Sequence, residues 1–298
     1  MPYPFTKNRE EIDAIEFQDI GPHNSFAPEL SAGISKYRAS LGNEATLDAL
    51  FVNQKSDTLV VSCHGALPRK TTVLPRFERL RTFLNSSYSS IFFGDPALHL
   101  SEQLSLAWYT GWKELDLYPV LAEWVTKAAQ ASNAEKILFV GSSGGGFASM
   151  QVSALVPGSM AVPLNPQTAI AKYRPKGSLG YARNYVKNVM PHLTPEGGVK
   201  NISAEVDWSA PLAERASTLI RYASPVKNYV LYAQNLNDLS HVTDHYEPFK
   251  EAVESGPNID RIRFFTYDGQ HTHTSPKPEV FKEIMDTAVL WMDDLQAT

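Results

Sequence analysis

Short apolar runs rich in β-branched and aromatic residues alternate along this chain with longer segments of helical period. Such alternation predicts an α/β fold in which a mostly parallel sheet is flanked by helices. The predicted strands are residues 58–62, 90–93, 137–140, 160–164, 229–233 and 261–267, and the predicted helices are 75–84, 117–128, 145–155 and a C-terminal helix.

Two of these helices show a clear apolar face. In the first, the apolar positions recur at the three- and four-residue spacing of one helix side, and the C-terminal helix repeats that pattern. The residues are Leu117, Val120, Leu121, Trp124, Val125 and Ala128 in the first helix, and Phe281, Ile284, Met285 and Ala288 in the last.

The alternation stops between residues 165 and 224, a stretch with five prolines and scattered aromatic residues. A structureless loop of this length is improbable inside a compact domain, so we expect some helix there, around residues 181–189. We interpret 165–224 as an inserted cap, a segment that would cover the mouth of a functional site. The predicted core is then 1–164 together with 225–298, and its first part, 1–56, contributes N-terminal edge strands at residues 14–17 and 47–52.

Composition narrows the functional classes. The 298 residues include 43% hydrophobic and 20% charged side chains, with a formal net charge of -5, as in an ordinary globular protein. No Lys and Arg stripe suggests a nucleic-acid partner, and no apolar run approaches the ~20 residues of a membrane span. Cys63 stands alone, so no intrachain disulfide can form. Residues 1–7 lack a basic segment followed by an apolar one, and we expect a cytoplasmic protein.

The most informative motif follows the apolar run 137–140. There Gly141, Ser143 and Gly145 form the pattern G-x-S-x-G, with Gly146 behind it. A serine perched on a sharp turn from strand to helix needs an unusual backbone angle and neighbours without a Cβ, so that strand and helix can approach closely. Ser143 is therefore the candidate nucleophile.

With His64-Gly65 at the end of the first core strand and Gly141-x-Ser143-x-Gly145 at a later one, the chain from about residue 57 to 298 resembles the α/β-hydrolase superfamily. In that family a serine, an acid and a histidine follow in this chain order, and the last two lie at the ends of late strands. The resemblance implies an α/β-hydrolase sheet and a Ser-His-Asp triad.

His271 is the preferred general base, because it follows the strand 261–267 and Gly269 as the family's histidine does. His273 is a close rival. A serine hydroxyl is a poor nucleophile until such an imidazole takes its proton. Either histidine alone could equally be a solvated loop residue, and the order of the triad favours a catalytic role.

Asp238, after the strand 229–233, is the preferred acid, which would orient the imidazole and stabilise its charged form. Asp244 is the runner-up. The alternative for Asp238 is a turn residue, since its Asn-rich surroundings favour turns. Glu205 and Asp207 in the predicted cap stay open, because some family members take their acid from that region.

An oxyanion hole needs fixed backbone donors. Gly144, directly after the nucleophile, is one candidate, and the other is Ala66 or Gly65 in a loop that resembles the family's His-Gly oxyanion loop. His64 itself is expected to shape that loop. The longer Gly-rich run of many esterases is absent, which leaves the substrate class open.

Other chemistry is less well supported. His241, His245 and Asp244, with His271 and His273, could be drawn as a metal site, but no Cys and no HExxH motif join them. No P-loop accompanies the glycines after the nucleophile, which argues against nucleotide binding. The aromatic stretch 108–112 could line an acyl pocket, although aromatic clusters are usually core. No cofactor and no metal ion is expected.

The resulting hypothesis is a serine hydrolase that forms an acyl-enzyme on Ser143 and cleaves a carboxylic ester. Its substrate would be a small-molecule or glycan-linked acyl compound. The same triad could serve an acyltransferase, an amidase or a thioesterase, because the pocket decides which nucleophile reaches the acyl group. A non-catalytic binding module on a hydrolase fold is the alternative from another class.

Overall fold

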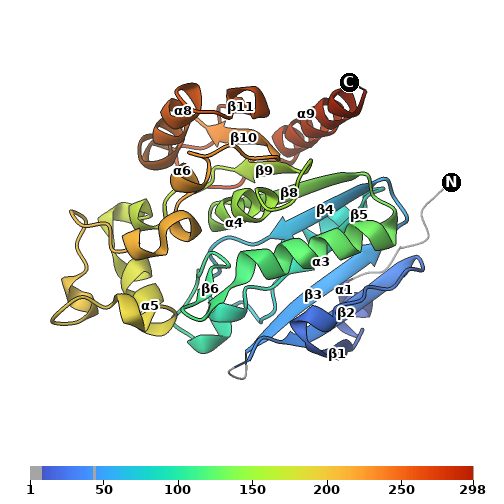
Figure 1. Ribbon diagram of the computed structural model, residues 1–298, viewed down its shortest axis with the longest axis horizontal. Coiled ribbons are helices and arrows are strands. Elements are labelled where there is room, and N and C mark those ends of the chain that lie inside the picture. The colour runs from blue at the N-terminus through green and yellow to red at the C-terminus, as the bar shows by residue number, and fades with distance from the viewer. Residues whose placement is uncertain (1–8, 43–44, 298) are drawn as a thin grey trace.

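The computed structural model describes residues 9–42 and 45–297. The N-terminal residues 1–7, on which the expectation about a leader segment depends, lie outside this part. Within it, nine strands form one sheet in the order β1-β2-β3-β5-β4-β8-β9-β10-β11 (Figure 1). Their bounds are Phe17–Pro22 for β1, Gly33–Ser40 for β2, Thr46–Asn53 for β3, Thr58–Cys63 for β4, Ser89–Phe93 for β5, Lys136–Ser142 for β8, Met160–Leu164 for β9, Tyr229–Asn235 for β10 and Ile262–Tyr267 for β11.

From β5 to β11 every neighbouring pair is parallel, whereas β3 is antiparallel to both β2 and β5. The mostly parallel α/β sheet is thus confirmed. Side chains of a strand alternate between two faces: Leu59 and Val61 of β4 pack into the core under α3, whereas Val60 packs into the core under α9. These helices, Leu117–Ser132 and Pro278–Gln296, cover opposite faces of the sheet.

The N-terminal region differs from the expectation in detail. The predicted strand 47–52 is β3, but it lies inside the sheet between β2 and β5 and is not an edge strand. The predicted strand 14–17 is wrong, because β1 begins only at Phe17. The sequence pattern gave no indication of β2, which pairs in parallel with β1 and antiparallel with β3. Its polar positions, such as Lys36, interrupt the apolar run that would have marked it.

The predicted helix 75–84 is also shorter than expected, because α2 spans only Leu80–Leu84. Arg79 takes a left-handed backbone conformation with φ 55° and places its guanidinium over the Phe281 ring at 3.9 Å. Directly before it, the Glu78 carbonyl accepts a hydrogen bond from Ser62 Oγ at 2.8 Å. These tertiary contacts hold the stretch before Leu80 in an irregular form.

Residues 165–224 contribute no strand to the sheet in the described structure and project to one side of it, at the left of Figure 1. The expected helix is present as α5, Gly180–Asn188. The rest consists of five short 3-10 turns and irregular loops, with α6, Thr218–Arg221, near its end. That this segment acts as a cap stays a prediction.

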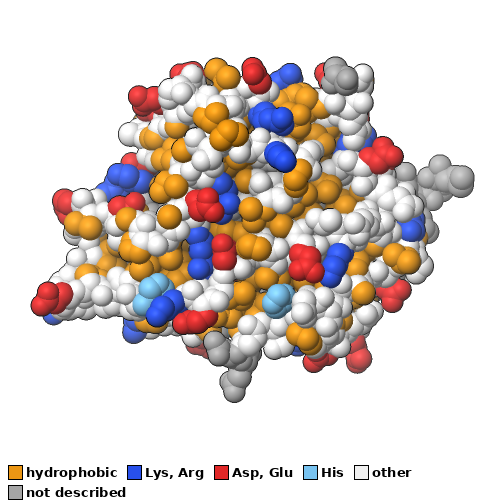
Figure 2. Space-filling view, viewed as in Figure 1, with side chains coloured by type: hydrophobic (Ala, Val, Ile, Leu, Met, Phe, Trp, Pro, Cys, Tyr) orange, Lys and Arg blue, Asp and Glu red, His pale blue; other side chains and the backbone are white. Residues whose placement is uncertain are grey.

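Lys and Arg side chains are interspersed with Asp and Glu on the face shown in Figure 2, and apolar side chains lie between them. That face carries no field of a single sign. None of the helices in the described residues is long and apolar enough to span a lipid bilayer.

Candidate active site

Ser143 lies at a sharp turn between β8 and α4, which spans Gly144–Ser153. Its backbone angles are φ 57° and ψ -120°, a sparsely populated conformation that a non-glycine residue adopts only when its surroundings enforce it. A Cβ at Gly141 would clash with the carbonyl of Gly145, and one at Gly145 would clash with the carbonyl of Cys63. The glycines therefore permit the close packing of strand and helix that the motif predicts.

Gln167 is the hydrogen-bond partner of the Ser143 hydroxyl. Its Nε2 donates to Ser143 Oγ at 2.6 Å, and its backbone N–H donates to the Ser143 carbonyl at 3.3 Å. The side chain is fully buried, and its Oε1 accepts from Trp108 Nε1 at 2.7 Å. Sequence reasoning missed Gln167, because no motif surrounds it.

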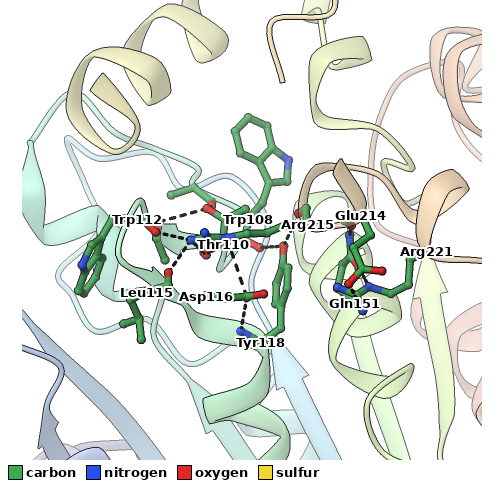
Figure 3. A network of polar contacts seen from close by, with 12 residues as sticks. Trp108, Thr110, Trp112, Leu115, Asp116, Tyr118, Gln151, Glu214, Arg215 and Arg221 are labelled. Carbon is green, nitrogen blue, oxygen red and sulfur yellow. Dashed lines mark hydrogen bonds and ion pairs between the residues drawn. The ribbon is translucent and has the colours of Figure 1, made fainter. Parts of the chain in front are cut away.

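The loop that carries Trp108 is held in an unusual conformation. Trp108 and Tyr109 are both fully buried and both have positive φ, 56° and 57°. The Tyr118 hydroxyl donates to the Trp108 carbonyl at 3.0 Å (Figure 3). Burial of residues 108–112 favours the core interpretation of this aromatic stretch, and the Trp108 indole extends that core to Gln167.

Arg215, from the 165–224 segment, ties that segment to the same loop. Its guanidinium donates to the carbonyls of Thr110, Trp112 and Leu115, and it lies 3.9 Å from Asp116 at the start of α3 (Figure 3). A guanidinium that donates to several backbone carbonyls at once is held in one orientation. The loop 108–115 is therefore stabilised by Arg215 and, at Trp108, by Tyr118.

Asp238 and His273 form a close pair at the carboxyl ends of β10 and β11. Asp238 is 2% exposed, and His273 Nδ1 lies 2.6 Å from Asp238 Oδ2. Burial acts to raise the pKa of the Asp238 carboxyl, but the imidazoles of His241 and His273 outweigh it and hold that pKa well below its usual value. The carboxylate is charged at neutral pH, as a partner for an imidazolium must be.

His271, the histidine preferred on sequence grounds, is exposed in the same loop, and the structure pairs Asp238 with His273 instead. The loop is anchored on both sides of the two histidines. Asn235 Nδ2 donates to the Gln270 carbonyl at 2.7 Å, and Asn165 Nδ2 donates to the Thr274 carbonyl at 2.8 Å. Between these anchors the imidazole of His273 lies on the Asp238 side, whereas that of His271 is exposed.

The other candidate acids have different partners. Asp244 lies 3.9 Å from Arg174. Asp207 is exposed, and its Oδ1 accepts the backbone N–H of Ser209 at 2.8 Å. Glu205 is exposed as well. Among these carboxyl groups, Asp238 is the one that the structure brings to an imidazole of the late loop.

Ser143 and the Asp238–His273 pair follow the carboxyl ends of their strands. Because β8, β9, β10 and β11 are adjacent and parallel, these ends lie along the same side of the sheet. Ligands of open α/β sheets bind at such an edge, outside the carboxyl ends of the strands. In the described residues no hydrogen bond joins Ser143 to His273; the hydroxyl oxygen accepts from Gln167. The fold thus brings Ser143, Asp238 and His273 to one region, and the Ser143 hydroxyl is hydrogen-bonded to the Gln167 amide.

The predicted oxyanion loop passes directly beside Ser143. A Cβ on Gly65 would lie 2.8 Å from the Ser142 carbonyl oxygen and 3.5 Å from Ser143 Cβ. Gly144 is the first residue of α4, where backbone N–H groups have no acceptor within the helix. Leu67 N–H is already bonded to the Ser105 carbonyl. Donors at Gly144 and at Gly65 or Ala66 thus stay candidates, and Leu67 does not.

His64 shapes this loop through its own hydrogen bonds. Its Nδ1 donates to the Gly65 carbonyl at 2.8 Å, and its Nε2 accepts the Asp95 backbone N–H at 3.2 Å. Burial lowers the pKa of His64 to about 4, so the ring is neutral at physiological pH. Tyr109 OH accepts the His64 backbone N–H at 3.0 Å and completes the support.

No known family model matches the chain, and no curated protein matches it by sequence. Solved structures do resemble it. The capsule O-acetyltransferase of Neisseria meningitidis serogroup A bound to CoA has a TM-score of 0.53 at 15% identity, covering 86% of this chain and 94% of its own. An esterase of Pyrococcus furiosus has a TM-score of 0.52 at 14% identity, with 91% and 98% covered. The chain has an α/β-hydrolase-type fold.

A third similar structure is the Gap123 complex of Streptococcus agalactiae, a glycosylation-associated protein, with a TM-score of 0.59 at 15% identity over 85% of this chain and 45% of that one. At such identities the likeness is one of fold. In this fold, the turn of Ser143 follows β8 and the loop of His273 follows β11.

A cavity of ≈ 360 Å³ opens beside the Asp238–His273 pair of this α/β-hydrolase-type fold. Its wall includes Tyr173 and Arg174 of the 165–224 segment together with His241. Its volume lies in the range of small-molecule pockets. His241 is buried, and its ring stacks on that of His273 with centroids 3.7 Å apart and 7° between planes.

Proposed function

We propose that this protein is a serine hydrolase that cleaves a carboxylic ester through an acyl-enzyme on Ser143. His273 is the general base, Asp238 orients it, and backbone N–H groups of Gly144 and of Ala66 or Gly65 bind the oxyanion. One observation carries the proposal: the Asp238–His273 pair, 2.6 Å between Oδ2 and Nδ1, lies at the same sheet edge as the strained turn of Ser143. His273 takes the role that sequence reasoning preferred for His271.

The chemistry follows from the atoms at this edge. Ser143 Oγ attacks the acyl carbon while its proton passes to His273 Nε2, and Asp238 stabilises the imidazolium through Nδ1–H. The negative oxygen of the tetrahedral intermediate is held by the backbone donors, which need no reorganisation. The alcohol leaves with the proton from His273, and water then repeats the steps to release the acid.

Gln167 is compatible with this role of Ser143. A hydroxyl has one donor and two acceptor sites, so Ser143 Oγ can accept from Gln167 Nε2 and still direct its own proton elsewhere. The amide fixes the oxygen on one side, and turning the O–H toward His273 leaves that bond in place. Gln167 is therefore a positioning residue for the nucleophile in this proposal.

The acyl acceptor stays open between water and another nucleophile. An acyl-enzyme can be resolved by a sugar or alcohol hydroxyl as well as by water, and amides or thioesters can form the same intermediate. We further propose that the substrate is a small-molecule or glycan-linked acyl compound and that the protein is cytoplasmic. Both inferences are supported by the sequence motif and composition alone.

A fluorophosphonate probe tests the nucleophile directly. We expect covalent labelling of the wild type on Ser143 and none in Ser143→Ala. Labelling should fall sharply in His273→Gln and stay near wild type in His271→Gln, a matched variant two positions away in the same exposed loop. An unreactive but folded wild type would favour the non-catalytic binding module.

A panel of p-nitrophenyl esters of increasing chain length then defines the acyl group, and the addition of a sugar or alcohol acceptor separates hydrolysis from transfer. Faster release of p-nitrophenol with an acylated acceptor as product would identify an acyltransferase. Full labelling of His273→Gln with loss in His271→Gln would restore His271 as the base.

A further inference from the structure

His241 is a buried histidine that the proposed hydrolysis does not use. The residue is 4% exposed, and neither ring nitrogen has a hydrogen-bond partner in the described structure. Its Nδ1 lies 3.4 Å from Asp238 Oδ2, at ion-pair distance but without a hydrogen bond. Buried polar groups are normally satisfied, so an orphaned imidazole in the wall of a cavity points to a ligand.

The surroundings of His241 show what that ligand could be. One ligand atom each from Asp238, His241 and His273 lie within 4.8 Å of one another. Two imidazole nitrogens and a carboxylate oxygen form a donor set typical of Zn²⁺ and related divalent transition metals. This set differs from the one drawn from the sequence: Asp238 supplies the carboxylate in place of Asp244, and neither His245 nor His271 belongs to it.

We propose that Asp238, His241 and His273 bind a divalent transition metal ion such as Zn²⁺, and that the bound ion reversibly inhibits the enzyme. The inhibition rests on the proposed function, whereas the binding does not. The metal ion takes no part in the hydrolysis and competes with it for the same two residues, Asp238 and His273.

The ring of His241 is free to take a ligand. Neither of its nitrogens has a hydrogen-bond partner in the described structure, and metal binding requires an available lone pair. His245 is excluded as a further ligand through Nδ1, because that atom accepts the Thr168 backbone N–H at 3.2 Å. The cavity beside the three residues supplies an entry path and room for a water ligand.

Binding requires a small rearrangement of the two rings. Zn²⁺ needs ligand distances of about 2.0–2.2 Å, so the stacked rings of His241 and His273 have to tilt apart. His273 is only half-buried, so its ring has open space on one side into which it can tilt. Asp238 Oδ2 already lies 2.6 Å from one Nδ1 and 3.4 Å from the other. The ion enters where the three atoms converge.

Inhibition follows from the proton on His273. In the metal-free protein Nδ1–H donates to Asp238 and Nε2 is free to accept a proton. Coordination through Nδ1 leaves the single ring proton on Nε2, with no net gain or loss of protons for a neutral ring. An imidazole protonated at Nε2 cannot act as the base for Ser143. Removal of the ion restores the original tautomer.

Calorimetric titration of Ser143→Ala with Zn²⁺ tests the site without relying on activity. We expect one ion per chain, and affinity at least about tenfold weaker in Ser143→Ala/His241→Gln, since even outer-shell changes cost metal sites 10–100-fold. His241→Phe in the same background keeps an aromatic ring on His273 and should lose the same affinity. His271→Gln is the control and should bind like the parent.

In the enzyme with intact Ser143, Zn²⁺ should reduce fluorophosphonate labelling, EDTA should reverse the effect, and the ratio of rates with and without Zn²⁺ should approach one in His241→Phe. Each variant is compared with itself, so a change in basal rate cancels. Unchanged Zn²⁺ affinity in both His241 variants, or loss of it in His271→Gln, overturns the site. A wild type that binds Zn²⁺ through His241 but never labels would instead contradict the proposed hydrolase.

Discussion

The side-chain amide of Gln167 donates a 2.6 Å hydrogen bond to the hydroxyl oxygen of Ser143, and both residues are buried. The bond connects the candidate nucleophile to the 165–224 segment and, through Trp108, to the aromatic core. A positioned hydroxyl has less rotational freedom to lose on reaching the transition state. In the proposed mechanism, Gln167 therefore connects the folding of the 165–224 segment to the reactivity of Ser143.

Replacing Gln167 by Ala removes this donor and leaves the Trp108 indole N–H without its acceptor. We expect the free energy of unfolding to fall by about 1–3 kcal/mol, the cost of an unsatisfied buried group, and fluorophosphonate labelling to slow by about tenfold as Ser143 loses its orientation. Trp108→Phe is the control, because it breaks the indole contact and keeps the amide. Labelling of Gln167→Ala at the wild-type rate would contradict the positioning role.

Replacing Gly65 by Ala tests the oxyanion loop. The added Cβ would meet the Ser142 carbonyl at 2.8 Å, so the backbone beside Ser143 has to shift. Because a misplaced donor costs transition-state stabilisation, we expect kcat to fall by about 10²-fold with a smaller change in KM. Ala66→Gly adds no atom and serves as the comparison. Equal kcat in Gly65→Ala and wild type would remove this loop from the oxyanion hole.

Asp238 makes a prediction about acid stability. Its pKa is lowered in the folded protein, so its contribution to stability is fully present above its unfolded pKa of about 4 and is lost as pH falls toward the lower folded value. Asp238→Asn should destabilise the protein by about 1.5–3 kcal/mol at pH 7, the worth of a charged hydrogen bond. In urea unfolding this difference should shrink at pH 3, and a constant difference would contradict it.

The sequence predicted the parallel core because its strands are apolar on both faces, as in β4 and β9, and the turn of Ser143 because its glycines mark the close approach. It could not select between His271 and His273. Both lie in one polar loop without periodicity, and the choice depends on which imidazole reaches Asp238, a residue of another loop.

Other parts of the site left little sequence signal. No motif surrounds Gln167, and His241 entered the sequence analysis only as one member of a possible metal site. Their contacts with Ser143 and His273 are tertiary. A tertiary contact also shortens the helix expected at 75–84. The hydrogen bond from Ser62 to the Glu78 carbonyl competes with the hydrogen bond that a longer helix would form there. Local pattern predicts elements and turns, whereas the partners of buried polar side chains emerge only from the packed fold.

His64 and Asp95 beneath the oxyanion loop predict opposing pH effects. Burial lowers the pKa of His64 to about 4, so its folded form resists protonation and stability falls as pH drops from about 6.5 to 4. Burial raises the pKa of Asp95 to about 6, so its folded form takes up a proton first and stability rises as pH drops from 6 toward 4. Over most of this range the two slopes cancel.

Asp95→Asn removes the compensating slope and leaves that of His64. Between pH 6 and pH 4 the variant should therefore lose about 2–3 kcal/mol more stability than the wild type, at about 1.4 kcal/mol per pKa unit. Urea unfolding at the two pH values measures the difference. His64→Gln removes the other slope, so this variant should lose less stability than the wild type between pH 6 and pH 4. The two variants therefore test the same pair of groups in opposite directions. Parallel pH curves for Asp95→Asn and wild type would show that the buried carboxyl is already ionised in this range.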